Sequence, residues 1–370
     1  MSGFSRPVHG GRGLFALSVV IYHVFNSGLP PVPMPWLLHQ GFDSLKFGVE
    51  LFFMISGYVI VGTMARARTP VQFIADRATR IYPVLWAVLP VAILANLSVA
   101  RGPLADGGIL GNLGMILANF LALGPVLPVT VIYGVTWTLS FEFAFYLLGF
   151  MILLGRRRGL DLTWLALALG LSYCVTEPRA LYFLPGVLVA LGWVEKVPLL
   201  RLLSRAPLFC LLAFLALWQA GSSDAIPHIP PIYQWHHGWI WLTGPLAFLA
   251  ATTFMNGLVH GRGLMSRLLQ TGPFIWLGTI SYSLYIWHPL VLGPVKNLFR
   301  KLALPEHLGA LTQPAFLLIT LPVCLLIATL SARYLEAGVT AWLRGRRRPP
   351  ASVAEGESPA ALKLDAARSI

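Results

Sequence analysis

The stretch that decides how this chain folds is GRGLFALSVVIYH, residues 11–23, an apolar segment with Arg12 near its start and His23 at its end. It predicts a helix, and the spacing between the two ionisable residues is about three helical turns. Both side chains are therefore expected on one face, roughly 16 Å apart along the axis. Ionisable groups inside a membrane span are costly and indicate a function. The alternative is a snorkelling Arg12 and a core His23 that bonds a neighbouring helix.

The rest of the chain is as apolar as this segment. Of its 370 residues 56% are hydrophobic and 11% are charged, and the mean hydropathy is +0.72. A soluble domain has about 25% charged residues, so the composition predicts an all-α, polytopic integral membrane helix bundle in the lipid bilayer. The net charge of +13 does not indicate a nucleic-acid partner, because the basic residues lie between apolar runs. The three cysteines lie in apolar segments without metal-ligand spacing, so no metal site is expected.

Apolar length and flanking charge predict ten membrane spans. Their ranges are 12–30, 46–64, 81–99, 135–154, 161–177, 180–194, 207–220, 239–258, 274–293 and 314–333. A further run, 109–124, carries two asparagines and is predicted to be re-entrant or interfacial. Residues 1–345 are expected to form one membrane domain, and 346–370 a disordered tail.

The distribution of basic residues predicts that both termini lie in the cytoplasm. With the N-terminus inside, most of the 27 lysines and arginines fall in inner segments. The outer segments hold Lys46, Arg101, Arg179, Lys296, Arg300 and Lys301. If 109–124 crossed the membrane, the triplet Arg156–Arg158 would lie outside, against the positive-inside rule.

Four ionisable residues are expected at similar depth in four spans: His23, Glu50, Glu142 and His288. Isolated, each would be costly in the membrane, whereas together they can pair with one another and form an acid/base centre. His288 belongs to a polar stripe along one face of its predicted helix, and Tyr282 lies next to this stripe. The residues of this stripe are Ser281, Tyr285 and His288. The alternative is that each is a satisfied polar residue of the core.

Arginines gather at the predicted inner edge. Arg77 and Arg80 are spaced i, i+3 where the third predicted span opens, and Arg12 lies at the same edge. Guanidinium groups on one helix face bind phosphates bidentately. The positive-inside rule alone is the alternative explanation. A phosphate-headed donor such as acyl-CoA would reach from these arginines to the histidines and carboxylates further out.

Five motifs, in this order, resemble the membrane O-acyltransferases called acyltransferase family 3, which acylate bacterial surface glycans, O-antigen, Nod factors and some macrolides. They are Arg12-x10-His23, GVELFFMISG at 48–57, RATRIYP at 77–83, WTLSFEF at 137–143 and SYSLYIWHP at 281–289. The resemblance implies a bacterial cytoplasmic-membrane enzyme with no permanently bound cofactor. It implies transfer of an acyl group, acetyl in the simplest case, from acyl-CoA to a hydroxyl of a carbohydrate, glycolipid or polyketide. It also implies that His23 is the central catalytic residue and that Arg12, Arg77 and Arg80 bind the donor.

In this interpretation His23, oriented by Glu142 or Glu50, removes the proton of the acceptor hydroxyl, and Ser281 or Tyr285 stabilises the oxyanion. A route through an acyl-imidazole is an alternative. Two other classes of protein fit the same pattern. A proton-coupled transporter or flippase would use the histidines and carboxylates as a relay, and a non-catalytic subunit of a polymer-assembly complex would use none of them. The arginines favour the enzyme, since a relay does not need them.

Overall fold

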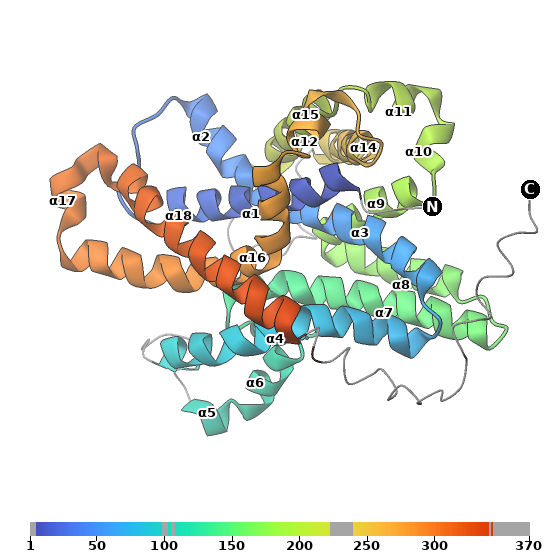
Figure 1. Cartoon of the computed structure of the whole chain (residues 1–370), viewed down its shortest axis with the longest axis horizontal. Coiled ribbons are helices and arrows are strands. Elements are labelled where there is room, and N and C mark those ends of the chain that lie inside the picture. Colours follow the sequence, from blue (N-terminus) through green and yellow to red (C-terminus); the bar gives the residue numbers. More distant parts are fainter. Residues whose placement is uncertain (1–4, 98–102, 105–107, 223–239, 340–341, 343–370) are drawn as a thin grey trace, which may run out of the picture.

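The computed structural model describes residues 5–97, 103–104, 108–222, 240–339 and 342. The predicted tail, 346–370, lies outside these residues. All elements among the described residues are helical (Figure 1), which confirms the all-α prediction. Helices follow from the apolar sequence, because in lipid each backbone polar group has to be satisfied within its own segment. The helices that build the site are α1 (Arg6–Phe25), α3 (Gly48–Arg66), α4 (Pro70–Leu97), α7 (Trp137–Arg157) and α16 (Gly272–Lys301).

Six helical segments of the described chain are long and apolar enough to cross a membrane. They are Arg6–Phe25, Trp36–Arg66, Pro70–Leu97, Gly134–Arg157, Leu242–Val259 and Leu304–Gly338. Three shorter apolar segments are Thr163–Thr176, Pro178–Ala190 and Pro207–Ala220. Together with the 30-residue helix α16, each of these segments overlaps one of the ten predicted ranges. The protein is therefore a polytopic membrane bundle, and the count of ten spans stays a prediction.

The other helices supply few or none of the predicted site residues. They are α2 (Trp36–Asp43), η1 (Ser44–Phe47), α5 (Gly108–Gly111), α6 (Leu113–Phe120), η2 (Gly134–Thr136), α8 (Thr163–Thr176), η3 (Pro178–Tyr182), α9 (Phe183–Ala190), α10 (Trp193–Lys196), α11 (Pro198–Leu203), α12 (Pro207–Ser222), α14 (Ile240–Val259), α15 (Gly263–Leu268), α17 (Leu304–Leu308), η4 (Gly309–Leu311), α18 (Thr312–Ser331) and the π-helix η5 (Ala332–Gly338). The run 109–124 breaks into α5 and α6. The eight residues of α6 extend only about 12 Å, which is too short to span a bilayer core of about 30 Å.

Two helices extend well beyond the predicted spans. Helix α4 begins at Pro70, eleven residues before the predicted start, so Arg77 and Arg80 lie inside the helix rather than at its entrance. Proline is well tolerated in the first turn, and no breaker follows it before Pro83. Helix α16 continues to Lys301 instead of ending near residue 293. In both cases apolar length marked only the part of the helix that fits hydrocarbon, while the helix itself continues through polar residues.

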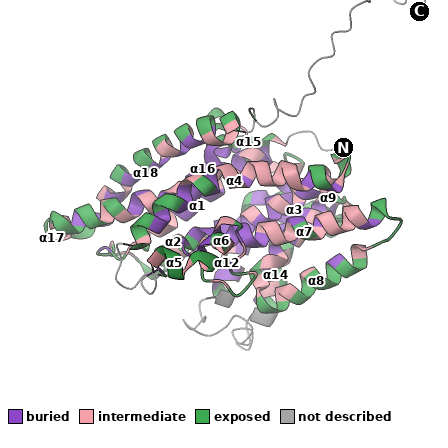
Figure 2. Ribbon diagram, turned by 90° about the horizontal axis from the view of Figure 1, so that it is seen from below, coloured by how far each residue is buried: buried purple, intermediate pink, exposed green. Residues whose placement is uncertain are grey.

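Helix α1 is packed at the centre of the bundle, mainly against α16 and α3. Its contact with α16 depends on glycine. A Cβ atom on Gly13 would lie 2.5 Å from the backbone nitrogen of Gly278, and one on Gly278 would lie 2.2 Å from the carbonyl oxygen of His9. Only glycines allow this approach, as is usual where membrane helices meet closely. Figure 2 shows buried residues concentrated on the central helices, whereas α8 is exposed along most of its length.

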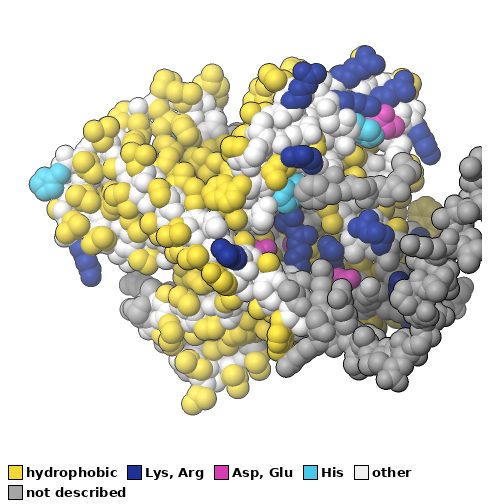
Figure 3. Space-filling view, in the orientation of Figure 1, with side chains coloured by type: hydrophobic (Ala, Val, Ile, Leu, Met, Phe, Trp, Pro, Cys, Tyr) yellow, Lys and Arg dark blue, Asp and Glu magenta, His cyan; other side chains and the backbone are white. Residues whose placement is uncertain are grey.

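The surface is divided by residue type. In Figure 3 hydrophobic side chains cover the end of the molecule around α17 and α18 and much of the middle, while lysines and arginines gather at the opposite end, over α10, α11 and α15. This asymmetry along the helix axes is what the positive-inside rule predicts for a membrane protein.

Candidate active site

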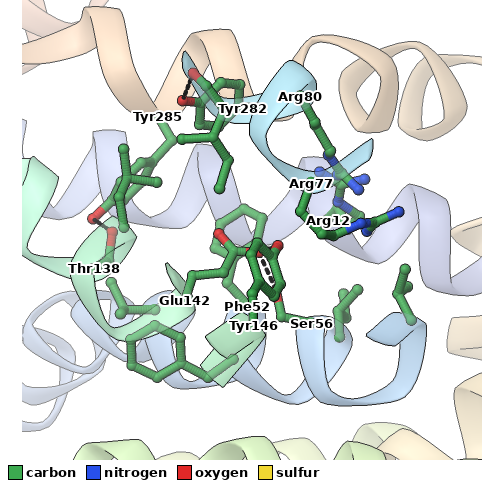
Figure 4. A pocket seen from close by; sticks show the side chains of 16 residues that line it. Arg12, Phe52, Ser56, Arg77, Arg80, Thr138, Glu142, Tyr146, Tyr282 and Tyr285 are labelled. Atoms are coloured by element: carbon green, nitrogen blue, oxygen red, sulfur yellow. Dashed lines mark hydrogen bonds between the residues drawn. The ribbon is translucent and has the colours of Figure 1, made fainter. Parts of the chain in front are cut away.

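Three arginines predicted to bind a phosphate group meet in one cavity. Arg12 comes from α1, and Arg77 and Arg80 come from α4 (Figure 4). The cavity has a volume of about 70 Å³, and we call it the basic cavity. Among the described residues none of the three guanidinium groups forms an ion pair within 4.0 Å, and the buried Nε of Arg77 has no hydrogen-bond partner. Three cations this close without a paired carboxylate favour an anionic ligand.

Glu142 lines the basic cavity as well, but it is bound to other groups. Its Oε1 accepts hydrogen bonds from the hydroxyl of Tyr146 and from Ser56 Oγ at 2.7 Å. Tyr146, one turn along α7, also lies beneath Arg77, with the guanidinium carbon 6.0 Å from the ring centroid. The structure therefore places Glu142 with the arginines and not against His23.

His23 lies in a second cavity of about 550 Å³, which we call the histidine cavity. His288 from α16 lines it too, with its ring centroid 5.1 Å from that of His23. His288 is fully buried, and its Nδ1 lies 2.7 Å from the carbonyl oxygen of Tyr285. Because a carbonyl can only accept, Nδ1 carries the proton of the neutral ring and Nε2 carries none. Within the described residues this Nε2 has no partner. The two histidines from the ends of the first and last motifs thus form one imidazole pair.

Glu50 is the second carboxylate expected to orient His23, and the structure places it elsewhere. The side chain is 1% exposed. Its Oε1 lies 3.4 Å from Arg179 Nε and 3.4 Å from the indole nitrogen of Trp218. Neither Glu50 nor Glu142 has a hydrogen bond or ion pair with a histidine in the described structure. That one of them orients His23 stays a prediction, since in this structure Glu142 is held by Tyr146 and Ser56 and Glu50 by Arg179 and Trp218.

The polar stripe on α16 divides into different roles. The hydroxyl of Ser281 is buried and donates to the carbonyl of Gly278 one turn back, at 2.9 Å, so it reaches neither cavity. Tyr282 lines the basic cavity and donates to the carbonyl of Ile81 on α4 at 2.7 Å. Tyr285 lines both cavities, and its hydroxyl accepts a hydrogen bond from Thr138. Tyr285 is therefore the member of the stripe that faces the passage between arginines and histidines.

A third cavity, of about 730 Å³, adjoins the basic cavity, and we call it the vestibule. Arg77 and Arg80 line both, while Val49 and Tyr285 line both the basic and the histidine cavity. The three spaces therefore follow one another through the bundle, and the basic cavity has the smallest volume of the three. Arg12 lines the basic cavity and His23 lines the histidine cavity next to it, because both side chains project from one face of α1.

Sequence reasoning missed several residues of this passage. Tyr146 is spaced i+4 from Glu142, which is a signal for a helical pair. Arg179 and Lys296 line the histidine cavity. The sequence could have pointed to them, because both are basic residues on the outer side, where the positive-inside rule makes basic residues rare. Glu336 in the π-helix η5 lines the vestibule and gave no signal, since π-helices cannot be recognised from composition.

Comparisons with known proteins place the chain in a family. Residues 8–331 match the model of an acyltransferase domain family. The exopolysaccharide production protein ExoZ of Rhizobium meliloti is 30% identical over 266 residues, which cover 67% of this chain and 77% of ExoZ. The peptidoglycan O-acetyltransferase OatA of Listeria monocytogenes is 24% identical over 90% of this chain and 55% of its own length. Nodulation protein 10 of Rhizobium leguminosarum is 31% identical over 27% of this chain and 31% of its own length. No solved structure matches.

The family match covers far more than half of the chain, including the four main helices that supply the arginines, Glu142 and the histidines. The chain therefore belongs to acyltransferase family 3, and it is a membrane-bound O-acyltransferase.

Proposed function

We propose that this protein transfers an acyl group, acetyl in the simplest case, from cytoplasmic acyl-CoA to a hydroxyl of a carbohydrate or glycolipid acceptor, with His23 as the general base. The observation that carries the proposal is the row of three cavities, with three arginines that form no ion pair among the described residues in the middle cavity and an imidazole pair in the next one. The relatives ExoZ and OatA, named for exopolysaccharide production and peptidoglycan O-acetylation, support a carbohydrate acceptor.

In this proposal the donor enters from the vestibule. Its phosphates bind Arg77 and Arg80, which line both the vestibule and the basic cavity, and Arg12 in the basic cavity, through charge-assisted hydrogen bonds. The nucleotide end stays in the vestibule, which has the largest volume of the three cavities. The thin pantetheine arm extends past Tyr285 towards His23. This orientation places the vestibule at the cytoplasmic face of a bacterial inner membrane, with both termini on that side. The basic surface in Figure 3 supports this orientation.

The reaction takes place in the histidine cavity. The neutral imidazole of His23 accepts the proton of the acceptor hydroxyl while the oxygen attacks the thioester carbonyl. The C–S bond then breaks, and the departing thiolate takes the proton from the His23 imidazolium. His288 fixes the site by packing against His23 with a defined tautomer. Tyr285 is the side chain at the entrance that can turn its hydroxyl towards the developing oxyanion.

A direct assay tests the proposal. We expect purified protein in nanodiscs to release free thiol from acetyl-CoA in an acceptor-dependent manner, measured with a thiol reagent. Radiolabelled acetyl should appear on the glycan in equal amount. A proton-coupled transporter with the same buried groups would instead move protons across the membrane without breaking the thioester. Proton flux into proteoliposomes of the same protein, without thiol release from acetyl-CoA, would overturn the proposal.

A further inference from the structure

The histidine cavity is lined by more positive charge than acyl transfer to a neutral sugar needs. Three cations line it, namely Lys46, Arg179 and Lys296, and among the described residues that line it there is no carboxylate. They come from three elements, η1, η3 and α16. The outer segments of the chain hold only six of the 27 lysines and arginines by the positive-inside assignment, and half of those six line this one cavity. Random placement of a depleted residue type would not concentrate it beside the catalytic histidine.

Arg179 is held so that its binding groups stay open. Glu50 contacts it at Nε, 3.4 Å away, and the guanidinium carbon lies 5.6 Å from the ring centroid of Trp137. Among the described residues the two Nη groups, which form the fork that binds oxyanions bidentately, donate no hydrogen bond, and the shortest contact with Glu50 is through Nε. The side chain is 45% exposed. A purely structural ion pair would use the fork itself, whereas here the buried carboxylate and the aromatic ring fix the guanidinium from behind.

Glu50 fits a positioning role better than a stabilising one. It is 1% exposed, and its Oε2 has no hydrogen-bond partner in the described structure. A buried carboxylate with one unsatisfied oxygen contributes little to folding, because its desolvation offsets the attraction to its partner. Its observable effect is to set the orientation of Arg179.

Lys296 supplies a second open cation. Its Nζ donates one hydrogen bond to the carbonyl of Ser27, at 3.2 Å, directly after the end of α1, and it has no acidic partner among the described residues. Lys46 differs, since Asp43 lies 2.6 Å from its Nζ and neutralises it. The open charge of the cavity therefore rests on Arg179 and Lys296.

We propose that Arg179 and Lys296 form an anion subsite in the histidine cavity, and that the acceptor of this enzyme is an acidic saccharide whose carboxylate or phosphate binds there. Glu50 and Trp137 position Arg179 for that contact. The inference rests on the proposed function, because it describes the acceptor end of the same passage. Binding the anionic group at Arg179 places a neighbouring hydroxyl beside His23 and selects acidic over neutral glycans.

Equilibrium binding to protein in phosphatidylcholine nanodiscs tests this subsite. The probes are two matched pairs: oligogalacturonate with its carboxyl-reduced product, and a polyprenyl-phosphate-linked sugar with the same sugar on neutral polyprenol. We expect at least one acidic probe to bind roughly tenfold or more tightly than its neutral counterpart. The pair that shows the preference identifies the source of the charge, as a uronate or a lipid-linked phosphate.

Variants assign the preference to the subsite. Arg179→Gln and Lys296→Gln should each reduce it, and Arg179→Lys should restore it only in part, because lysine lacks the fork. Glu50→Gln should weaken it through the loss of orientation. Lys301→Gln, an exposed outer lysine outside the cavity, is the matched control and should keep it. No acidic preference in either pair, or one that survives both Arg179→Gln and Lys296→Gln, would overturn the proposal.

A donor measurement separates this inference from the proposed function. Acetyl-CoA binding should be unchanged in Arg179→Gln, since the arginines of the basic cavity are intact. If wild-type protein neither binds nor cleaves acetyl-CoA, the proposed function fails, whatever the saccharide probes show. If it does both without preferring an acidic probe, only the anion subsite fails.

Discussion

At the scale of single residues, His23 is the side chain on which the chemistry depends. If it is the general base, His23→Gln should lower acetyl transfer by roughly 10²- to 10⁴-fold, because an amide of similar size cannot accept the proton. The rate of the wild type should also fall as pH drops through the imidazole pKa, since the base has to be neutral. Acetyl-CoA binding, measured separately, should remain. A folded Gln variant with normal activity would instead make His23 a structural residue.

The arginines of the basic cavity make a separate prediction for the donor. Arg80→Ala, and to a smaller extent Arg77→Ala, should weaken apparent acetyl-CoA affinity by about 1.5–3 kcal/mol, the value of one charge-assisted hydrogen bond. Arg156→Ala is the control, since this exposed arginine at the end of α7 lines none of the three cavities. Unchanged affinity in both cavity variants would reduce these arginines to determinants of topology.

At the scale of helices, the position of His23 beside His288 depends on how closely α1 packs against α16. Gly13→Ala places a methyl group against the backbone of Gly278 and Leu277 at 2.5–2.6 Å, so the helices have to separate. Overpacking of this kind costs about 1–3 kcal/mol. We expect a lower unfolding temperature in detergent and a loss of transfer activity. Gly272→Ala in α16, where a Cβ meets nothing within 4 Å, should change neither, and equal effects of the two substitutions would contradict this account.

A second contact between elements links helix α10 to the residue that precedes α15. Arg262 donates two hydrogen bonds to Glu195, at 2.8 and 2.9 Å. They hold the pKa of Glu195 at about 2, below its ordinary 4.5. A carboxyl group whose pKa is lower in the folded than in the unfolded protein stabilises the fold at pH values above its unfolded pKa. This contribution is therefore present at neutral pH and is lost as pH falls from about 4.5 towards 2.

Glu195→Gln should therefore cost about 1 kcal/mol at pH 7 and almost nothing near pH 2, as measured by thermal unfolding in detergent. Glu306→Gln, at an exposed position in α17, should have no effect at either pH. A penalty for Glu195→Gln that does not depend on pH would show that the ion pair is not its cause.

At the scale of the whole molecule, the topology depends on the segment 109–124. Because α5 and α6 are too short to span, the predicted cytoplasmic face includes Arg157 and excludes Asp106. In a cysteine-free background, Asp106→Cys should react with an impermeant thiol reagent in intact cells, and Arg157→Cys only after permeabilisation. Labelling of both from the same side would refute the ten-span arrangement. The background requires replacing Cys174, Cys210 and Cys324.

The sequence alone determined the architecture and the residue types of the site. A span needs about 20 apolar residues, and basic residues mark its inner end, so the helix positions and the non-spanning segment follow from local composition. Helical periodicity likewise predicts that Arg12 and His23 share a face, since both lie on one continuous element. Helix ends were less predictable, as α4 and α16 show, because a helix continues into water beyond its apolar length.

Only the tertiary structure decided which side chains meet. Depth in the membrane placed His23, Glu50, Glu142 and His288 at one level, but depth does not say which way each helix is rotated about its axis. That rotation is set by close contacts such as those of Gly13 with α16, which depend on residues hundreds of positions apart. It brings His23 to His288, turns Glu142 towards Tyr146 and Ser56, and leaves Glu50 with Arg179. The sequence thus determined which groups are present, and packing between helices determined which of them are partners.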